Sequence, residues 1–132
     1  MIACKILIID DDTDDVEILS DAFKSSGVEY VHYVHTAMEA FMFLEEQKNK
    51  ESLPKLIVTD MYLPGMTGAE FLKDLKEMDN YKHIPIVVLS STKSTYEIEK
   101  YKNLGNIDYV EKPSTYEEYK KVAAYINNKI EA

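Results

Sequence analysis

The sequence predicts an α/β fold in which five parallel strands form a doubly wound sheet, (βα)5. Short apolar runs, typical of buried strands, alternate five times with segments whose apolar residues recur every three or four positions, as in helices. This alternation is typical of a parallel sheet with helices on both faces. Polar residues that could carry chemistry follow several of the runs, at the sheet edge where such folds bind ligands.

Five apolar runs are predicted to be the strands. They are residues 5–9, 28–34, 56–60, 84–89 and 107–110. The second run is rich in β-branched and aromatic residues, which favour strands. Pro85 lies near the start of the fourth run, where a proline is tolerated. The third run ends on Asp60 and is followed at once by a turn rich in Pro and Gly, which predicts a buried strand with an acid at its carboxyl end.

Helices are predicted between the strands and after the last one. The first should begin inside the acidic cluster 10–15, with Asp12 or Thr13 as its N-cap and with Asp14 and Asp15 at the positive end of the helix dipole. The apolar faces show helical spacing. They are Val16, Leu19 and Phe23; Ala37, Ala40, Phe41 and Leu44; Phe71, Leu72, Leu75 and Met78; Tyr96, Ile98, Tyr101 and Leu104; and Tyr116, Tyr119, Ala123, Ile126 and Ile130.

Length and charge limit the function. The 132 residues suffice for one domain, and we expect a single domain over residues 1–132 with no output domain. The net charge of −9 disfavours direct binding of nucleic acid. No apolar run approaches the roughly 20 residues that a membrane helix needs. The lone Cys4 lies next to the first apolar run, and no secretion signal is evident, so we expect a cytoplasmic location.

Reactive side chains follow four of the predicted strands. Asp10 and Asp11 follow the first, Asp60 ends the third, Ser90 follows the fourth and Lys112 follows the fifth. All four positions share one edge of a doubly wound sheet. Three carboxylates that meet there repel one another, and a hard divalent cation, Mg²⁺ or Mn²⁺, would relieve the repulsion. Such a cation, the ammonium of Lys112 and a hydroxyl would form a cradle for a phosphoryl group, with Asp60 as its acceptor.

Four motifs in this order resemble a response regulator receiver domain, the CheY-like type of two-component signalling, in its stand-alone form. They are IIDDD at 8–12, VTDMYLPGMTG at 58–68, PIVVLSS at 85–91 and DYVEKP at 108–113. The resemblance covers nearly the whole chain. It implies the strand order 2-1-3-4-5 and a phosphorelay function. The loop 47–54 is longer than in the shortest members and resembles that of receivers associated with phytochrome-type kinases.

The resemblance also implies roles for single residues around a metal ion. Asp60 would accept a phosphoryl group from the phosphohistidine of a sensor histidine kinase or a phosphotransfer protein. Asp11 and Asp60 would bind Mg²⁺ directly, and Asp10 would act mainly through a metal-bound water. The backbone carbonyl of Tyr62 would complete the protein ligands.

A switch is implied as well. The hydroxyl of Ser90 would move to the phosphoryl group, Lys112 would contact another phosphoryl oxygen, and Tyr109 would turn inward. The change would alter a protein-binding face formed by the fourth helix, the fifth strand and the last helix, through which the chain would also form a weak dimer if it is not monomeric. The downstream protein target is not identified by the sequence. Members hydrolyse their aspartyl phosphate slowly, so we do not expect an enzyme.

Other interpretations stay open. A receiver that only binds partners would need no phosphorylation, although such domains typically lose the acceptor, the acid pair or the lysine. A haloacid-dehalogenase-type phosphatase also uses an Asp nucleophile, but Asp14 stands where its motif needs Thr or Val. A nucleotide- or flavin-binding module lacks support, because no Gly-rich loop follows the first strand.

Several of the singled-out residues also have plainer explanations. Asp12, Asp14 and Asp15 suit a helix N-terminus, and Tyr109 suits ordinary packing. Thr13 and Ser114 depart from the commonest receiver pattern, which has Pro and an apolar residue at these positions. Neither departure touches the chemistry.

Overall fold

The computed structural model describes residues 6–28, 30–47, 50–91, 94–103, 105 and 107–131. Within these ranges the chain alternates between strands and helices in the predicted order. Cys4, the predicted strand residue Lys5 and the predicted helix residue Leu104 lie outside the described residues.

Five parallel strands form the main sheet, in the order β2-β1-β3-β6-β7. Their bounds are β1 Ile6–Ile9, β2 Val31–Val34, β3 Leu56–Thr59, β6 Ile86–Ser90 and β7 Ile107–Glu111. Counted along the chain without the small hairpin described below, this is the order 2-1-3-4-5. The sequence prediction of a doubly wound α/β sheet is therefore confirmed.

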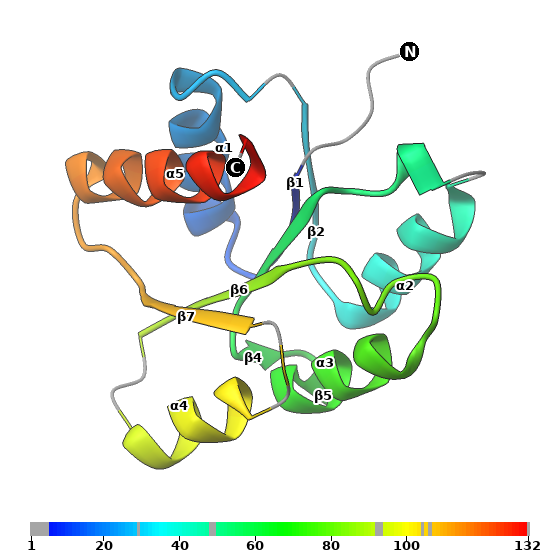
Figure 1. Ribbon diagram of the computed structural model, residues 1–132. Coiled ribbons are helices and arrows are strands. Elements are labelled where there is room, and N and C mark those ends of the chain that lie inside the picture. Colours follow the sequence, from blue (N-terminus) through cyan, green and yellow to red (C-terminus); the bar gives the residue numbers. More distant parts are fainter. Residues whose placement is uncertain are drawn as a thin grey trace.

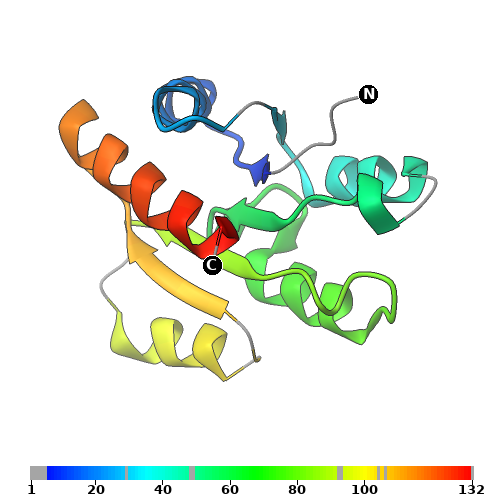
Figure 2. The same ribbon diagram turned by 45° about the horizontal axis from the view of Figure 1, so that its top comes forward.

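Helices cover both faces of this sheet (Figure 1). Their bounds are α1 Thr13–Ser25, α2 Ala37–Glu46, α3 Gly68–Glu77, α4 Thr95–Lys102 and α5 Tyr116–Glu131, with a 3-10 turn η1 at Lys50–Ser52. Figure 2 shows α1 and α5 on one face and α2 and α3 on the other. The helix α4 packs beside the edge strand β7.

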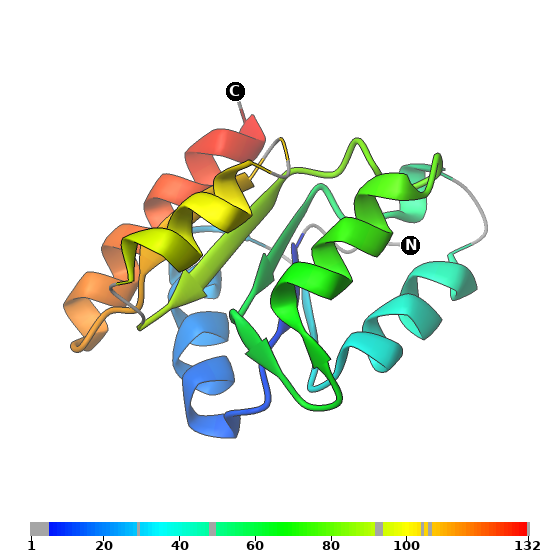
Figure 3. The same ribbon diagram turned by 90° about the horizontal axis from the view of Figure 1, so that it is seen from below.

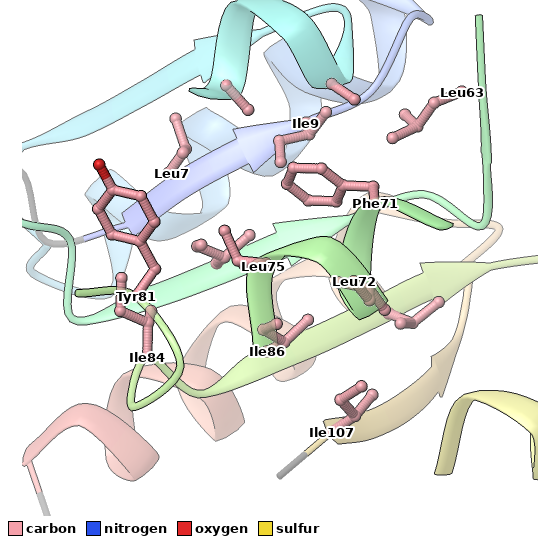
Figure 4. Close-up of a cluster of buried hydrophobic side chains, with 14 of the residues drawn as sticks. Leu7, Ile9, Leu63, Phe71, Leu72, Leu75, Tyr81, Ile84, Ile86 and Ile107 are labelled. Carbon is pink, nitrogen blue, oxygen red and sulfur yellow. The ribbon is translucent and has the colours of Figure 1, made fainter. Parts of the chain in front are cut away.

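The buried core has two halves, one on each face of the sheet. Successive side chains of a strand point to opposite faces, so Leu7 and Ile9 of β1 belong to one half and Ile6 and Ile8 to the other. The first half packs against α2, α3 and Tyr101 of α4, and Figure 4 shows its side chains. The second packs against α1 and α5. Burial on both faces explains why the runs that form β1, β3 and β6 are almost continuously apolar.

A two-stranded antiparallel hairpin follows β3 and was not predicted. It pairs β4 (Tyr62–Leu63) with β5 (Met66–Thr67), and Figure 3 shows it beside the start of α3. Gly65 in its turn has φ of +76°, a conformation that favours glycine. The turn signal in the sequence marked this point, but strands of two residues are too short to give a periodic pattern.

Several element ends differ from the predictions, and β3 and β7 each differ by one residue, ending at Thr59 and Glu111. β2 begins at Val31, although Val28 is buried and belongs to the core half under α1 and α5. β6 begins after Pro85 and extends to Ser90. α3 ends before Met78, which is 38% exposed and does not complete the predicted apolar face.

Among the described residues, no helix combines the length and the apolar character needed to cross a membrane.

Candidate functional site

The site lies at the carboxyl ends of four neighbouring strands. Asp10 follows β1 and Asp60 follows β3, and the register pairs Ile9 with Thr59 just before them. The N–H of Asp60 donates to the carbonyl of Ile9 over 3.0 Å, which extends the ladder by one residue. Ser90 ends β6, and its carbonyl accepts the N–H of Lys112 at 2.9 Å. The backbone therefore fixes where these side chains begin.

Three carboxylates meet at this edge. Carboxylate oxygens of Asp10, Asp11 and Asp60 lie within 4.8 Å of one another. Asp10 is buried, Asp60 is half-buried and Asp11 is exposed, so the cluster opens toward solvent on one side. Closely spaced oxygen donors of net negative charge fit a hard divalent cation such as Mg²⁺. The residues present thus fit the metal that the sequence predicts.

The pKa of Asp10 is raised in this cluster. Its Oδ1 accepts the N–H of Asp12 at 3.0 Å, and its Oδ2 accepts a hydrogen bond from Lys112 at 3.1 Å. Burial raises the pKa of Asp10 more than these two partners lower it, and the nearby charge of Asp60 raises the pKa further. A bound cation would favour the charged form of this carboxylate.

Lys112 stands between three carboxylates. Its Nζ lies 2.7 Å from Oδ2 of Asp15, 3.1 Å from Oδ2 of Asp10 and 3.5 Å from Oδ2 of Asp60. Burial alone would lower the pKa of Lys112, but the hydrogen bond to Asp15 and the charges of Asp10 and Asp60 outweigh it and raise the pKa. The ammonium therefore stays charged beside the predicted acceptor.

Asp60 directs its two carboxylate oxygens differently. Its Oδ1 accepts the N–H of the next residue, Met61, at 2.7 Å, whereas its Oδ2 faces Lys112. This bond joins adjacent residues and is therefore not the Asx turn of a turn-forming Asp, which reaches the residue two positions on. It fixes the side-chain torsion, so that the second oxygen points into the cluster.

The predicted switch residues lie on neighbouring strands. Ser90 is buried, and its main-chain carbonyl accepts a hydrogen bond from the hydroxyl of Tyr109 at 3.2 Å. Tyr109 is half-buried and packs against the core half that contains Phe71. Tyr62 starts β4, two residues beyond Asp60, and its side chain is 56% exposed. A ligand role for its carbonyl stays a prediction.

Asp15 is a member of the site that sequence reasoning missed. The acids of the cluster 12–15 suit a helix start, and Asp12 is indeed the N-cap of α1, since its side chain accepts the N–H groups of Asp14 and Asp15. The carboxylate of Asp15, however, turns to Lys112, and its other oxygen accepts the hydroxyl of Tyr119 at 3.4 Å. Burial and the charge of Asp15 raise the pKa of Tyr119 to about 12.

A second missed contact supports the loop after the acceptor. The hydroxyl of Tyr101, from α4, donates to the carbonyl of Met61 at 2.9 Å, and the N–H of Gly68 donates to the same carbonyl at 2.9 Å. Tyr101 is buried. Its position in an apolar helical pattern predicted burial but gave no signal for the partner of its hydroxyl.

The chain is similar to known signalling proteins. The family model for the response regulator receiver domain matches residues 6–124. The two-component response regulator ORR1 of Oryza sativa is 33% identical over 113 residues, which cover 83% of this chain but only 49% of that relative. Response regulator ORR12 of the same species is 31% identical over 121 residues, with 92% and 96% coverage. The chain thus spans about half of one relative and nearly all of the other.

Solved structures show the same architecture. The phosphorylated cyanobacterial phytochrome response regulator RcpA superimposes with a TM-score of 0.85 at 27% identity, covering 99% of this chain and 96% of the other. The Mn²⁺-bound form of response regulator Rcp1 gives 0.79 at 26% identity, with coverage of 95% and 92%. The chemotaxis response regulator CheY4 of Vibrio cholerae gives 0.77 at 22% identity, covers 98% and 99%, and supports the fold alone.

Proposed function

The chain belongs to the response regulator receiver domain family of two-component systems, and we propose that Asp60 is its phosphoacceptor. A carboxylate oxygen of Asp60 would form a bond to the phosphorus of a phosphohistidine. The P–N bond would break, and the imidazole of the kinase or phosphotransfer protein would leave with the electron pair. The product is an aspartyl phosphate.

One observation carries the proposal. At the carboxyl edge of the sheet, the ammonium of Lys112 lies 3.1 Å from Asp10 and 3.5 Å from Asp60, two of the three clustered carboxylates. A phosphoryl group on Asp60 would place more negative charge beside this ammonium, whose N–H groups can donate hydrogen bonds to the phosphoryl oxygens. The phosphorylated state of the similar RcpA supports the same chemistry here.

We assign the metal to the same cluster. Asp11 and Asp60 would hold Mg²⁺ or Mn²⁺ directly, Asp10 would hold it through a water, and the Tyr62 carbonyl would complete the set. The cation would neutralise charge that develops on the transferring phosphoryl group. The carboxylate spacing supports this assignment, as does the Mn²⁺-bound form of the similar Rcp1.

Signal output would use protein contact. The hydroxyl of Ser90 would move to the phosphoryl group, and Tyr109, bonded to the Ser90 carbonyl, would follow. This change would alter a binding face on α4, β7 and α5, where Tyr96 is 78% exposed, and where a weak dimer would also form. Hydrolysis of the aspartyl phosphate would be slow, so we propose a phosphoacceptor rather than an enzyme, with a cytoplasmic location.

The proposal is tested by intact mass after incubation with acetyl phosphate. We expect a gain of one phosphoryl group with Mg²⁺, no gain with EDTA, and no gain in Asp60→Asn. Asp74→Asn, which changes an exposed acid of α3, is the matched control and should be labelled like the wild type. Labelling that persists in Asp60→Asn would refute the acceptor assignment.

Two other results would favour the alternatives. Absence of labelling by acetyl phosphate and by a panel of phosphorylated histidine kinases would favour a receiver that binds partners without phosphorylation. Multiple turnover of a generic phosphate ester would favour a phosphatase with Asp60 as nucleophile.

A further inference from the structure

Lys112 shares its ammonium between two kinds of carboxylate. Asp10 and Asp60 belong to the cluster that could hold a metal ion, whereas Asp15 does not. Yet the contact of Lys112 with Asp15, at 2.7 Å, is the shortest of the three. The carboxylate nearest to the lysine ammonium is therefore the one that lies outside the cluster of Asp10, Asp11 and Asp60.

This arrangement bears on a conflict inside the site. A cation bound by Asp60, and through water by Asp10, would interact with the same two carboxylates that Lys112 contacts. It would also repel the ammonium of Lys112. Without a third partner, Lys112 would have to compete with the metal or leave a partly buried charge unpaired, and both cost free energy. An ammonium has three donors, so a third carboxylate can hold it while the other two change partners.

We propose that Asp15 is a positioning residue that keeps Lys112 beside Asp60 when a divalent cation engages Asp10 and Asp60. The inference rests on the proposed function, because it takes this cluster to be the metal site. Asp15 touches neither the acceptor nor the phosphoryl group. It acts through Lys112, and it makes metal binding and retention of the lysine compatible.

The surroundings of Asp15 hold its carboxylate in place for this task. It lies in the first turn of α1, where the N–H of its own backbone is fixed by the N-cap Asp12. Its Oδ1 accepts the hydroxyl of Tyr119, a residue of α5 that is only 4% exposed, and its Oδ2 is left for Lys112. The helices α1 and α5 pack against each other, so two elements orient one carboxylate (Figure 2).

The test is the binding of Mg²⁺ alone, measured by calorimetric titration or by shifts of backbone amide resonances. Asp15→Asn removes the third partner of Lys112, so we expect the half-saturating Mg²⁺ concentration to rise about fivefold relative to Asp14→Asn. Asp14→Asn is the matched control, because it removes the same charge from an exposed neighbour in the same turn. Asp15→Glu should recover part of the loss.

A second set of measurements, in a variant that lacks Lys112, separates positioning of the lysine from a general electrostatic or structural effect. In Lys112→Met, no ammonium competes for the metal ligands, so Asp15→Asn and Asp14→Asn should change Mg²⁺ binding equally. Tyr119→Phe keeps the buried ring but removes the bond to Asp15. It should raise the half-saturating Mg²⁺ concentration by a smaller factor than Asp15→Asn, whereas the exposed Tyr116→Phe should not.

Each outcome decides a different claim. Equal effects of Asp15→Asn and Asp14→Asn with Lys112 present would overturn the positioning role, and so would a difference that survives in Lys112→Met. A wild type that does not bind Mg²⁺ would overturn both the metal assignment and this inference. Mg²⁺ binding with the expected pattern, but without labelling of Asp60, would refute only the phosphoacceptor function.

Discussion

The hydroxyl of Tyr109 on β7 donates a hydrogen bond to the main-chain carbonyl of Ser90 on β6, across 3.2 Å. The same carbonyl accepts the backbone N–H of Lys112 at 2.9 Å. A half-buried aromatic side chain and the backbone of the site lysine thus share one acceptor. A displacement of the β6 end would disturb both bonds, so Tyr109 is placed to respond to events at the cluster.

Replacing Tyr109 by Phe should therefore destabilise the protein while leaving the acceptor intact. Loss of the bond to the Ser90 carbonyl should lower the free energy of unfolding by about 1 kcal/mol, measured by urea denaturation in EDTA. Asp60 should still be labelled by acetyl phosphate with Mg²⁺. Tyr96→Phe is the control, because Tyr96 is 78% exposed, and it should change stability by less than about 0.5 kcal/mol. A stability equal to that of the wild type would mean that the bond is not formed in solution.

The sequence predicts the sheet well because burial on both faces leaves a strong signal. Runs such as 6–9 are apolar at every position, and the helices between the strands show regular apolar faces. Once the strands are parallel, their carboxyl ends share an edge, and Asp10, Asp60 and Lys112 must approach one another. This part of the site follows from topology alone.

Contacts that depend on side-chain direction do not follow from topology. The sequence shows Asp15 as one acid among several at a helix start, and only the structure, in which α1 packs against α5, reveals that its carboxylate turns to Lys112. Of the tyrosines on the predicted apolar faces of the last two helices, Tyr101 and Tyr119 are buried, whereas Tyr96 and Tyr116 are exposed. Both buried hydroxyls bond to groups near the site, which a pattern of apolar spacing cannot show.

Gly68 should be intolerant of any side chain. A Cβ at this position would lie 2.5 Å from the carbonyl oxygen of Met61 and 2.7 Å from the hydroxyl of Tyr101. Gly68→Ala should therefore lower the free energy of unfolding by about 2 kcal/mol or more, because the backbone next to the acceptor has to move. Urea denaturation would measure the loss.

The double variant Gly68→Ala with Tyr101→Phe shows where the clash lies. Removing the hydroxyl relieves only one of the two contacts, so the double variant should regain little stability over Gly68→Ala alone. A full recovery would place the whole clash at the tyrosine and contradict the close approach to the backbone.

His32 should make stability depend on pH well away from the site. Its ring stacks on Phe43 of α2, with centroids 4.2 Å apart and planes 14° apart. Burial lowers the pKa of His32 below 6.5, and the charge of Glu46 offsets part of this effect. Because the unfolded chain takes up the proton first, stability contributed by the neutral ring is present above pH 6.5 and is lost as the pH falls through the folded-state pKa.

The measurement is the free energy of unfolding from about pH 7 to pH 5, where an imidazole titrates. His32→Gln should show a smaller decrease over this range than the wild type, even if its absolute stability is lower. His83→Gln, which changes an exposed residue, is the control. Parallel curves for the wild type and His32→Gln would refute the assignment.

Mg²⁺ should stabilise the folded chain through Asp11. This carboxylate is the exposed member of the cluster, and its replacement removes a proposed metal ligand at little cost in packing. In EDTA, Asp11→Asn should be at least as stable as the wild type, because one of three mutually repelling charges is gone. At a Mg²⁺ concentration about 100 times the dissociation constant, the wild type should gain about 2.7 kcal/mol, and Asp11→Asn should gain much less at that concentration.

Asp14→Asn, which lies outside the cluster, should keep most of the gain. An equal gain in wild type and Asp11→Asn would show that the cation binds without this carboxylate, and the ligand set would then have to be drawn from Asp10 and Asp60 alone.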